Sequence, residues 1–183
     1  MTEARHRANR SSPYVELVLG GARSGKSRYA ERRALADGRE CIYIATAQAG
    51  DAEMAARIEH HRERRSGFAA TIEEPLQLAA VIARQMRESR CLLVDCLTLW
   101  LTNLLLCGDE MRLARERAAL FEVLGAAHGH ILLVSNEVGQ GVVPADALSR
   151  RFVDESGRLH QELAAACDRV VFITAGLPQI LKD

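Results

Sequence analysis

Short apolar runs alternate along this chain with longer stretches in which apolar residues recur at helical spacing. The apolar runs are rich in β-branched residues and nearly continuous, which is typical of strands buried on both faces of a parallel sheet. The pattern therefore predicts a central sheet. Its strands are expected at Tyr14–Gly20, Cys41–Ala45, Cys91–Cys96, His130–Ser135 and Val170–Thr174, with a weaker strand at Ala69–Glu73.

Helical patterns lie between these runs, and strands that alternate with helices indicate right-handed βαβ units. The fold class predicted is α/β, a three-layer fold with a mostly parallel central sheet. A length of 183 residues suits one domain. We expect that domain to span residues 14–183, after a polar, disordered extension over residues 1–13. The helices are expected at Lys26–Asp37, Asp51–Arg65, Pro75–Ser89, Met111–His128 and Ala145–Cys167.

Charge and composition exclude several classes of protein. The chain has 24 Lys+Arg against 24 Asp+Glu, and a formal net charge of zero argues against nucleic-acid binding. No apolar run approaches the roughly 20 residues that span a bilayer, so membrane insertion is not expected. The five cysteines form no CxxC pair, which favours reduced core thiols in the cytoplasm over a zinc site.

The clearest motif is GGARSGKS at residues 20–27, a complete GxxxxGK[ST] match between the first strand and the first helix. Such a loop binds phosphates through backbone N–H groups, with Lys26 reaching the β and γ oxygens and Ser27 available to Mg²⁺. The sequence therefore predicts a P-loop NTPase-type fold and a nucleotide site. Its residues are Gly20, Gly21, Ala22, Arg23, Ser24, Gly25, Lys26 and Ser27.

A P-loop enzyme also needs a carboxylate at the end of a neighbouring strand. Asp95 ends the strongest apolar run of the chain and is the candidate for binding Mg²⁺. An alternative is that Asp95 caps the helix that follows the strand. Together, the loop and this carboxylate indicate a nucleoside triphosphatase or a kinase.

Lysine is rare in this chain, where only Lys26 and Lys182 stand among 24 basic residues. Neither lies in an NKxD or a KxDG sequence. Guanine recognition by an NKxD loop and covalent nucleotidyl transfer to a KxDG lysine are therefore excluded. A covalently carried nucleotide would need another nucleophile.

The predicted helix within residues 50–65 (GDAEMAARIEHHRERR) places its two adjacent histidines on different sides. At 100° per residue, His61 lies on the apolar side, whereas His60 lies beside Arg57 and Arg64. Such a face would suit phosphate, because arginine pairs with phosphate oxygens, and a neutral histidine there can act as a nucleophile. A solvated, salt-bridged helix with an idle histidine is an equally good interpretation of the spacing.

These segments together resemble the bifunctional adenosylcobinamide kinase / adenosylcobinamide-phosphate guanylyltransferase family of cobalamin biosynthesis. The similarity runs from the first strand to the last, in order. The matching segments are GGARSGKSRYAE (20–31), YIATAQ (43–48), DAEMAARIEHHRERR (51–65), LLVDCLTLWLTNLL (92–105), SNEVGQGVVP (135–144) and RFVDESGRLHQELAAACDRV (151–170).

The resemblance implies two reactions in one P-loop domain. ATP or GTP phosphorylates adenosylcobinamide, and a histidine, here His60, then takes GMP from GTP and passes it to the phosphorylated corrinoid, giving adenosylcobinamide-GDP. Lys26 and Asp95 would serve the kinase step, with Ser27 and Asp95 binding Mg²⁺. The resemblance also implies a homotrimer. Further nucleotide contacts would fall on Ala45, Thr46, Ala47, His61, Arg62, Glu63, Arg64 and Glu73.

One position departs from the family pattern: where the family often carries a tryptophan, this chain has Ala69, with Phe68 adjacent and Thr71 and Glu73 kept. Two other functions remain as alternatives. A plain P-loop kinase would lack the covalent step, and a nucleotide-dependent switch would bind GTP without a small acceptor.

Overall fold

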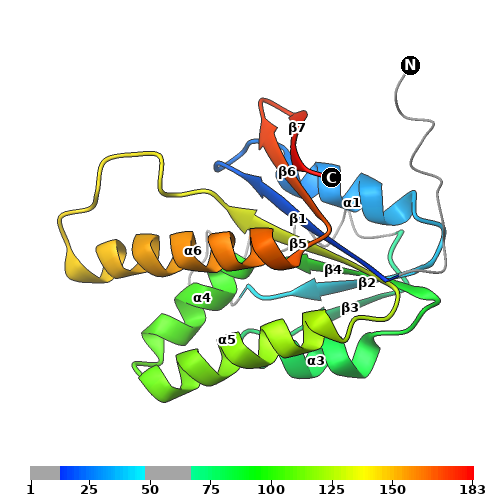
Figure 1. Cartoon of the computed structure of the whole chain (residues 1–183), viewed down its shortest axis with the longest axis horizontal. Helices are drawn as coiled ribbons and strands as arrows, with labels where there is room; N and C mark the ends of the chain where they lie inside the picture. Colours follow the sequence, from blue (N-terminus) through cyan, green and yellow to red (C-terminus); the bar gives the residue numbers. More distant parts are fainter. Residues whose placement is uncertain (1–12, 48–66) are drawn as a thin grey trace.

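The computed structural model describes residues 13–47 and 67–183, which form one seven-stranded sheet with helices on both faces (Figure 1). The strand order is β3-β2-β4-β5-β1-β6-β7; β7 runs antiparallel to β6, and every other neighbouring pair is parallel. The predicted mostly parallel α/β fold is confirmed. The strands are β1 (Tyr14–Gly20), β2 (Glu40–Ala45), β3 (Ala70–Glu73), β4 (Arg90–Asp95), β5 (His130–Asn136), β6 (Arg169–Thr174) and β7 (Leu177–Lys182).

The helices form the outer layers. One face of the sheet carries α1, and the other carries α3, α4, α5 and α6 (Figure 1). The predicted helix over residues 51–65 lies outside the described residues, as does the extension up to residue 12. The helices are α1 (Lys26–Leu35), α3 (Leu78–Gln85), α4 (Leu97–Leu106), α5 (Glu110–Gly125) and α6 (Ala147–Ala166).

Two elements were not predicted from periodicity, α4 and β7. Helix α4 reads LTLWLTNLLL and buries six of its ten residues, so it lacks the polar stripe that marks an amphipathic helix. Strand β7 is exposed along its whole length and contains Pro178, which an edge strand tolerates. The predicted helix at residues 75–89 is shorter in the structure, where α3 begins at Leu78 and ends at Gln85.

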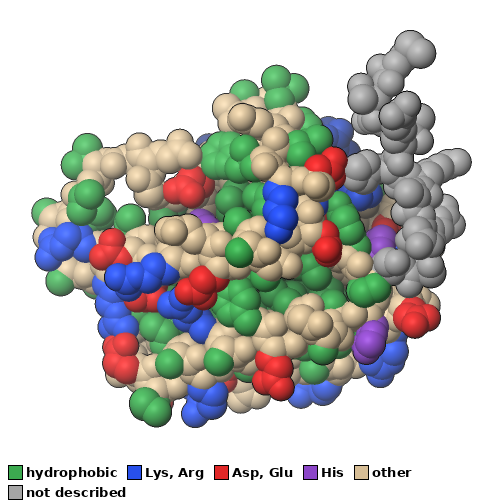
Figure 2. Space-filling model, viewed as in Figure 1, with side chains coloured by type: hydrophobic (Ala, Val, Ile, Leu, Met, Phe, Trp, Pro, Cys, Tyr) green, Lys and Arg blue, Asp and Glu red, His purple; other side chains and the backbone are tan. Residues whose placement is uncertain are grey.

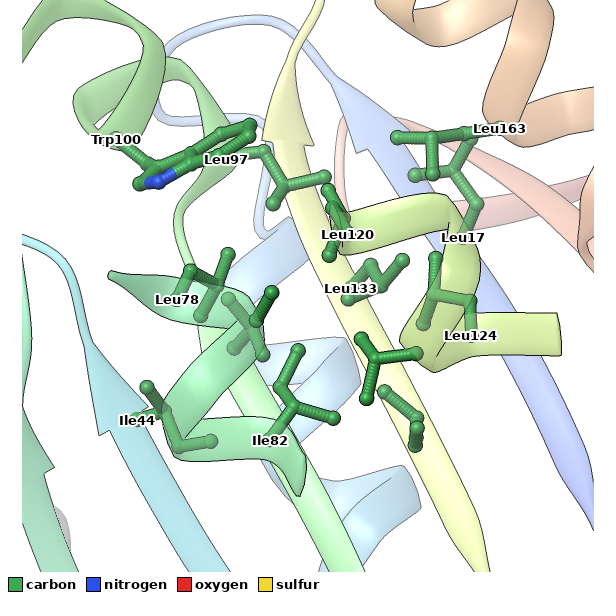
Figure 3. Packing of buried hydrophobic residues seen from close by; sticks show 14 of the residues in the cluster. Leu17, Ile44, Leu78, Ile82, Leu97, Trp100, Leu120, Leu124, Leu133 and Leu163 are labelled. Atoms are coloured by element: carbon green, nitrogen blue, oxygen red, sulfur yellow. The ribbon is translucent and has the colours of Figure 1, made fainter. Parts of the chain in front are cut away.

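The core has two parts, one on each face of the sheet. On the face that carries the larger cluster, Leu17 and Leu133 of the sheet pack against residues from four helices, Trp100 of α4 among them (Figure 3). The indole N–H of Trp100 donates to the carbonyl of Leu76 at 2.8 Å, so this fully buried side chain is also satisfied as a donor. On the other face, a smaller cluster that includes Tyr43 packs beneath α1. The sheet is thus covered on both faces, as its continuous apolar strands require.

The cysteines follow the prediction of core thiols except at one position. Cys41, Cys91, Cys96 and Cys167 are free and buried, whereas Cys107, just after α4, is exposed. The correction has a simple cause, because the apolar run that precedes Cys107 is a helix that ends there, where the chain leaves the core.

Charged side chains of both signs intermingle on the face shown in Figure 2. On α5 and α6, Arg117 contacts Glu155 and Glu162, and Arg158 contacts Glu155. The charged side chains visible on this face are therefore mixed in sign rather than gathered into one large patch of a single sign. Among the described residues, no helix is both long enough and apolar enough to cross a membrane.

Candidate nucleotide-binding site

The predicted site residues that the structure describes lie along one edge of the sheet, toward which the arrows of the parallel strands point (Figure 1). Asp95 and Glu73 are both in register with Ala45, and Gly20 is in register with Asn136. Parallel strands end at the same edge, and ligands of open α/β sheets bind in the crevice outside those ends. Pairing between distant strands thus places the P-loop, the end of β2 and Asp95 at the same edge, whereas Glu73 ends β3, the edge strand that lies furthest from β1 on this side of the sheet.

The P-loop joins β1 to α1, as the sequence predicts. Gly25 is the N-cap residue of α1 and has a φ of 95°, a left-handed conformation that glycine adopts without strain. A Cβ added at Gly20 would lie 2.6 Å from the carbonyl oxygen of Ile173. Lys26 is 7% exposed, and its Nζ donates to the carbonyl of Gly21 at 3.1 Å. The ammonium group of Lys26 therefore contacts the backbone of the P-loop itself.

Ser24 contributes a polar group that the described part of the chain leaves unsatisfied. Its Oγ is buried and has no hydrogen-bond partner among the described residues. A buried hydroxyl without a partner is costly in the absence of a ligand. Ser24 lies within the phosphate-binding motif, so its hydroxyl is a candidate for binding a phosphate oxygen.

The turn between β6 and β7 packs against the P-loop, a contact that sequence reasoning did not anticipate. The Gly176 N–H donates to the Ser24 carbonyl at 2.8 Å, and a Cβ on Gly25 would lie 3.2 Å from the Cα of Gly176. Gly176 itself has a φ of 80°. The hairpin thereby fixes the backbone of the loop from the side opposite β5.

Asp95 lies at the end of β4 with its side chain partly exposed. Its Oδ2 accepts a hydrogen bond of 3.0 Å from the hydroxyl of Tyr43 on β2. The N-cap residue of α4 is Cys96, and no side-chain hydrogen bond caps that helix. The alternative in which Asp95 caps the next helix is therefore wrong, and within the described part of the chain its carboxylate accepts its hydrogen bond from the Tyr43 hydroxyl.

Thr46 joins the ends of β2 and β4. It is fully buried; its Oγ1 donates to the Cys96 carbonyl at 2.6 Å and accepts from the Cys96 N–H at 2.9 Å. Asn103 of α4 donates to the Thr46 carbonyl at 2.9 Å. Ala47 follows with partial burial. The residues after β2 thus hold the backbone next to Asp95 in place.

Cys96 lies in the same corner. Burial, with a smaller contribution from Asp95, raises the pKa of its thiol to about 11. The group stays a neutral thiol at physiological pH and is not activated as a nucleophile.

Phe68, beside the position that departs from the family pattern, is half-buried. Its ring meets Tyr43 edge-on, with the ring centroids 5.2 Å apart. Ala69 is exposed. Phe68 therefore belongs to the α1-side core and does not replace an exposed aromatic residue at position 69.

The end of β5 contributes a group of polar residues to which sequence reasoning gave no role. Asn136 donates to the hydroxyl of Thr98 at 2.9 Å, and the Glu137 N–H donates to the Gly20 carbonyl at 3.0 Å. The stretch SNEVGQGVVP was recognisable as a motif, but nothing in its local sequence indicates that β5 pairs with the P-loop strand. The order of the strands alone places these residues between the P-loop and Asp95.

Comparison with known families and structures agrees with this geometry. Residues 16–181 match the model of the family described as cobinamide kinase / cobinamide phosphate guanyltransferase. The chain belongs to this family. Its fold is similar to that of the flagellar accessory protein FlaH of Methanocaldococcus jannaschii, with a TM-score of 0.55, at 13% identity over 92% of this chain and 78% of that chain. A second solved structure, an ATPase domain, gives a TM-score of 0.50, with 12% identity over 87% of this chain and 68% of that chain.

Relatives within the family are close. The chain is 62% identical over 167 residues to the bifunctional adenosylcobalamin biosynthesis protein CobP of Pseudomonas aeruginosa, covering 91% of this chain and 96% of the relative. It is 40% identical over 179 residues to the protein named CobU of Escherichia coli, covering 91% of this chain and 98% of the relative. The relatives are thus matched over almost their whole length, and the resemblance noted in the sequence is confirmed at the level of the family.

Five residues of the predicted site lie outside the described ranges 13–47 and 67–183. They are His60, His61, Arg62, Glu63 and Arg64.

Proposed function

We propose that this protein phosphorylates adenosylcobinamide with ATP or GTP and then transfers GMP from GTP to the product through His60, giving adenosylcobinamide-GDP. Membership of the family supports both activities, and the close relatives are named as bifunctional adenosylcobalamin biosynthesis proteins. The observation that carries the proposal is a complete P-loop at the end of β1, at the same sheet edge as Asp95.

The P-loop supports the first reaction. Phosphoryl transfer depends mainly on positioning the phosphates and neutralising their charge, with little covalent help from the protein. Lys26 would shift its ammonium group from the Gly21 carbonyl to the β and γ oxygens, and the buried Ser24 hydroxyl would gain its missing partner. The loop backbone residues from Gly20 to Gly25 would bind the phosphates through their N–H groups.

Ser27 and Asp95 fit the requirements of Mg²⁺, which would neutralise charge on the phosphates. Both offer oxygen ligands and are partly accessible, and Mg²⁺ in nucleotide sites is held by one or two protein oxygens together with phosphates and waters. The described residues contain no group of three or more His, Cys, Asp or Glu side chains that could hold a metal ion. With only Ser27 and Asp95 as protein ligands, Mg²⁺ would bind together with the nucleotide, whose phosphates supply further oxygen ligands.

His60 is proposed as the nucleophile of the second reaction. Its nitrogen attacks the α-phosphorus of GTP, the bond to the bridging oxygen breaks, and pyrophosphate leaves. The phosphate of the corrinoid then displaces the histidine from the same phosphorus. Splitting one displacement into two lowers the barrier of each, and neither a lysine nor the neutral Cys96 competes for this role.

Three further aspects belong to the same proposal. The remaining nucleotide contacts are Ala45, Thr46, Ala47, Glu73 and the segment His61–Arg64, by family resemblance. The protein is proposed to act in the cytoplasm, where its five free thiols stay reduced, and to form a homotrimer without nucleic-acid or membrane partners.

The test is an intact-mass measurement after incubation with GTP and Mg²⁺. An acid-labile GMP adduct is expected on the wild-type protein and not on His60→Ala. Adenosylcobinamide phosphorylation should survive in His60→Ala. The absence of an adduct from a wild-type protein that phosphorylates the corrinoid would leave the plain P-loop kinase as the function.

A further inference from the structure

Helix α6 buries two polar side chains, Ser156 and His160, beside two leucines. Ser156 is 1% exposed and His160 is 6% exposed. A polar side chain costs stability in a core unless it is hydrogen-bonded, and leucine would pack well at either position. Polar residues on this face therefore indicate a role other than packing.

His160 connects two residues at the end of β5. Its Nε2 lies 2.7 Å from Oγ of Ser135, and its Nδ1 lies 3.6 Å from Oε2 of Glu137. Burial lowers the pKa of His160, although Glu137 opposes this effect, so the ring is neutral at physiological pH. With its one proton on Nδ1, the ring would point a donor toward the carboxylate and accept from the serine hydroxyl.

Ser135 is fully buried, which excludes it as a nucleophile for an external substrate. Its hydroxyl instead fixes the orientation of the His160 ring. The carboxylate of Glu137, in contrast, is 21% exposed, with Oε1 accepting from the Gly139 N–H at 2.6 Å. Of the three contacting residues Ser135, His160 and Glu137, only Glu137 therefore offers its polar group to an external substrate.

The position of Glu137 distinguishes it from the other carboxylates at this edge of the sheet. Its backbone bonds to Gly20, the first residue of the P-loop, because β5 is the strand next to β1. Glu73 ends the far edge strand, and Glu74 accepts from the backbone of the turn before α3. Asp95 is one strand further from β1 and is bonded to Tyr43.

We propose that Glu137 is a catalytic residue of the kinase step and that His160 is its positioning residue. The proposal rests on the proposed function. The hydroxyl oxygen of the acceptor forms a bond to the γ-phosphorus, and the bond from that phosphorus to the β–γ bridging oxygen breaks, so the nucleoside diphosphate leaves with the electron pair. Glu137 receives the proton of the hydroxyl and returns it to solvent. Asp95, which ends β4 on the side of β5 away from β1, would remain available to bind Mg²⁺.

The test compares Glu137→Gln with the wild-type protein in adenosylcobinamide phosphorylation. Glutamine keeps the shape and the acceptor for the Gly139 N–H but cannot take the proton. The kcat should fall by about 10²-fold while the KM for ATP changes less than about threefold. Glu122→Gln, an exposed position on α5, is the matched control.

His160 is tested by two substitutions that keep different nitrogen positions. His160→Gln keeps a polar group toward Ser135 but loses the donor near Glu137, and its kcat should fall by about tenfold. His160→Asn keeps the donor near Glu137 and should recover most of that loss. In the double variant with Glu137→Gln, His160→Gln should cause no further loss of kcat, because both substitutions remove the same function, proton acceptance by Glu137. His128→Gln, at an exposed position, is the control.

The outcomes separate the two proposals. A wild-type protein that does not phosphorylate adenosylcobinamide would overturn the proposed function. An active wild type with an equally active Glu137→Gln variant would overturn only the catalytic role of Glu137. Additive losses in the double variant, with equal effects of Gln and Asn at position 160, would show that His160 acts in packing alone.

Discussion

The hydroxyl of Tyr43, a side chain 1% exposed beneath α1, donates a hydrogen bond of 3.0 Å to Oδ2 of Asp95 on the neighbouring strand. The two strands are parallel, and Ala45 of β2 is in register with Asp95. A phenol held by the core therefore fixes the orientation of a carboxylate at the edge of the sheet. The remaining oxygen, Oδ1, can face the nucleotide.

Replacing Tyr43 by phenylalanine should weaken catalysis more than folding. Loss of the hydrogen bond is expected to lower the free energy of unfolding by about 1 kcal/mol. The kcat for corrinoid phosphorylation should fall by about tenfold, because Asp95 would no longer be held in one orientation. Tyr29→Phe is the control, since its hydroxyl lies 3.4 Å from Glu16, inside the sheet and away from the edge. Equal kcat values for the two variants would contradict the role of Tyr43.

The two lysines should respond in opposite ways to substitution by alanine. Lys26→Ala removes the charge that neutralises the phosphates, so kcat/KM for phosphorylation should fall by about 10²-fold or more. Lys182 donates to the carbonyls of Ala164, Ala165 and Cys167 at the end of α6, at 3.1, 2.9 and 2.6 Å. Lys182→Ala should therefore cost about 1–2 kcal/mol in urea denaturation and leave turnover unchanged. Near wild-type phosphorylation by Lys26→Ala would remove the P-loop assignment.

Thr46→Val should destabilise the protein although it changes the side-chain volume little. The substitution leaves the N–H and the carbonyl of Cys96 without the partner that Oγ1 provides in the buried interior. The expected decrease in the free energy of unfolding is about 2–4 kcal/mol, measured by urea denaturation. Thr46→Ser keeps the hydroxyl and should lose much less. If valine and serine behave alike, the two hydrogen bonds between Thr46 and Cys96 do not stabilise the protein.

Asp37 should make stability depend on acid pH. Burial opposes ionisation of Asp37, but hydrogen bonds with His130 and Arg39 outweigh it and lower the pKa of the carboxyl group. The native state then binds fewer protons than the unfolded state near and below the ordinary pKa of about 4. The stabilisation from Asp37 is present above that pH and is lost as the pH falls through the lowered native value.

The measurement is urea denaturation of wild type and Asp37→Asn between about pH 2 and pH 7. At pH 7 the variant should be less stable by about 1–3 kcal/mol, because Arg39 loses a charged partner at 2.8 Å. The difference should shrink as the solution is acidified below about pH 4. Asp154→Asn, at an exposed position on α6, should show no such convergence. A constant difference across the range would mean that another group causes the acid sensitivity.

Much of the fold could be predicted because buried strands leave a local signal. The runs at Tyr14–Gly20 and Cys91–Cys96 are mostly apolar and nearly continuous, and the strands observed there are almost as expected. The same criterion could not separate α4 from a strand, because its leucines leave no polar face. Strand β7 was invisible for the opposite reason, since an exposed edge strand needs no apolar run.

The site divides in the same way between local and distant interactions. The P-loop could be recognised because all of its chemistry lies within eight consecutive residues. Asp95 could be proposed from its place at the end of an apolar run, but two roles remained open. Only the structure excluded the cap, because the N-cap residue is the next one along the chain, Cys96.

By itself, the sequence determined the class of fold and the phosphate-binding loop with its Lys26, because strand patterns and short motifs are properties of consecutive residues. It also carried the family resemblance, which the comparisons confirm. The tertiary structure alone decided which strand lies next to the P-loop, and so placed Glu137 beside Gly20 and His160 beside Glu137. Strand order is set by packing between distant segments, and no local pattern records it.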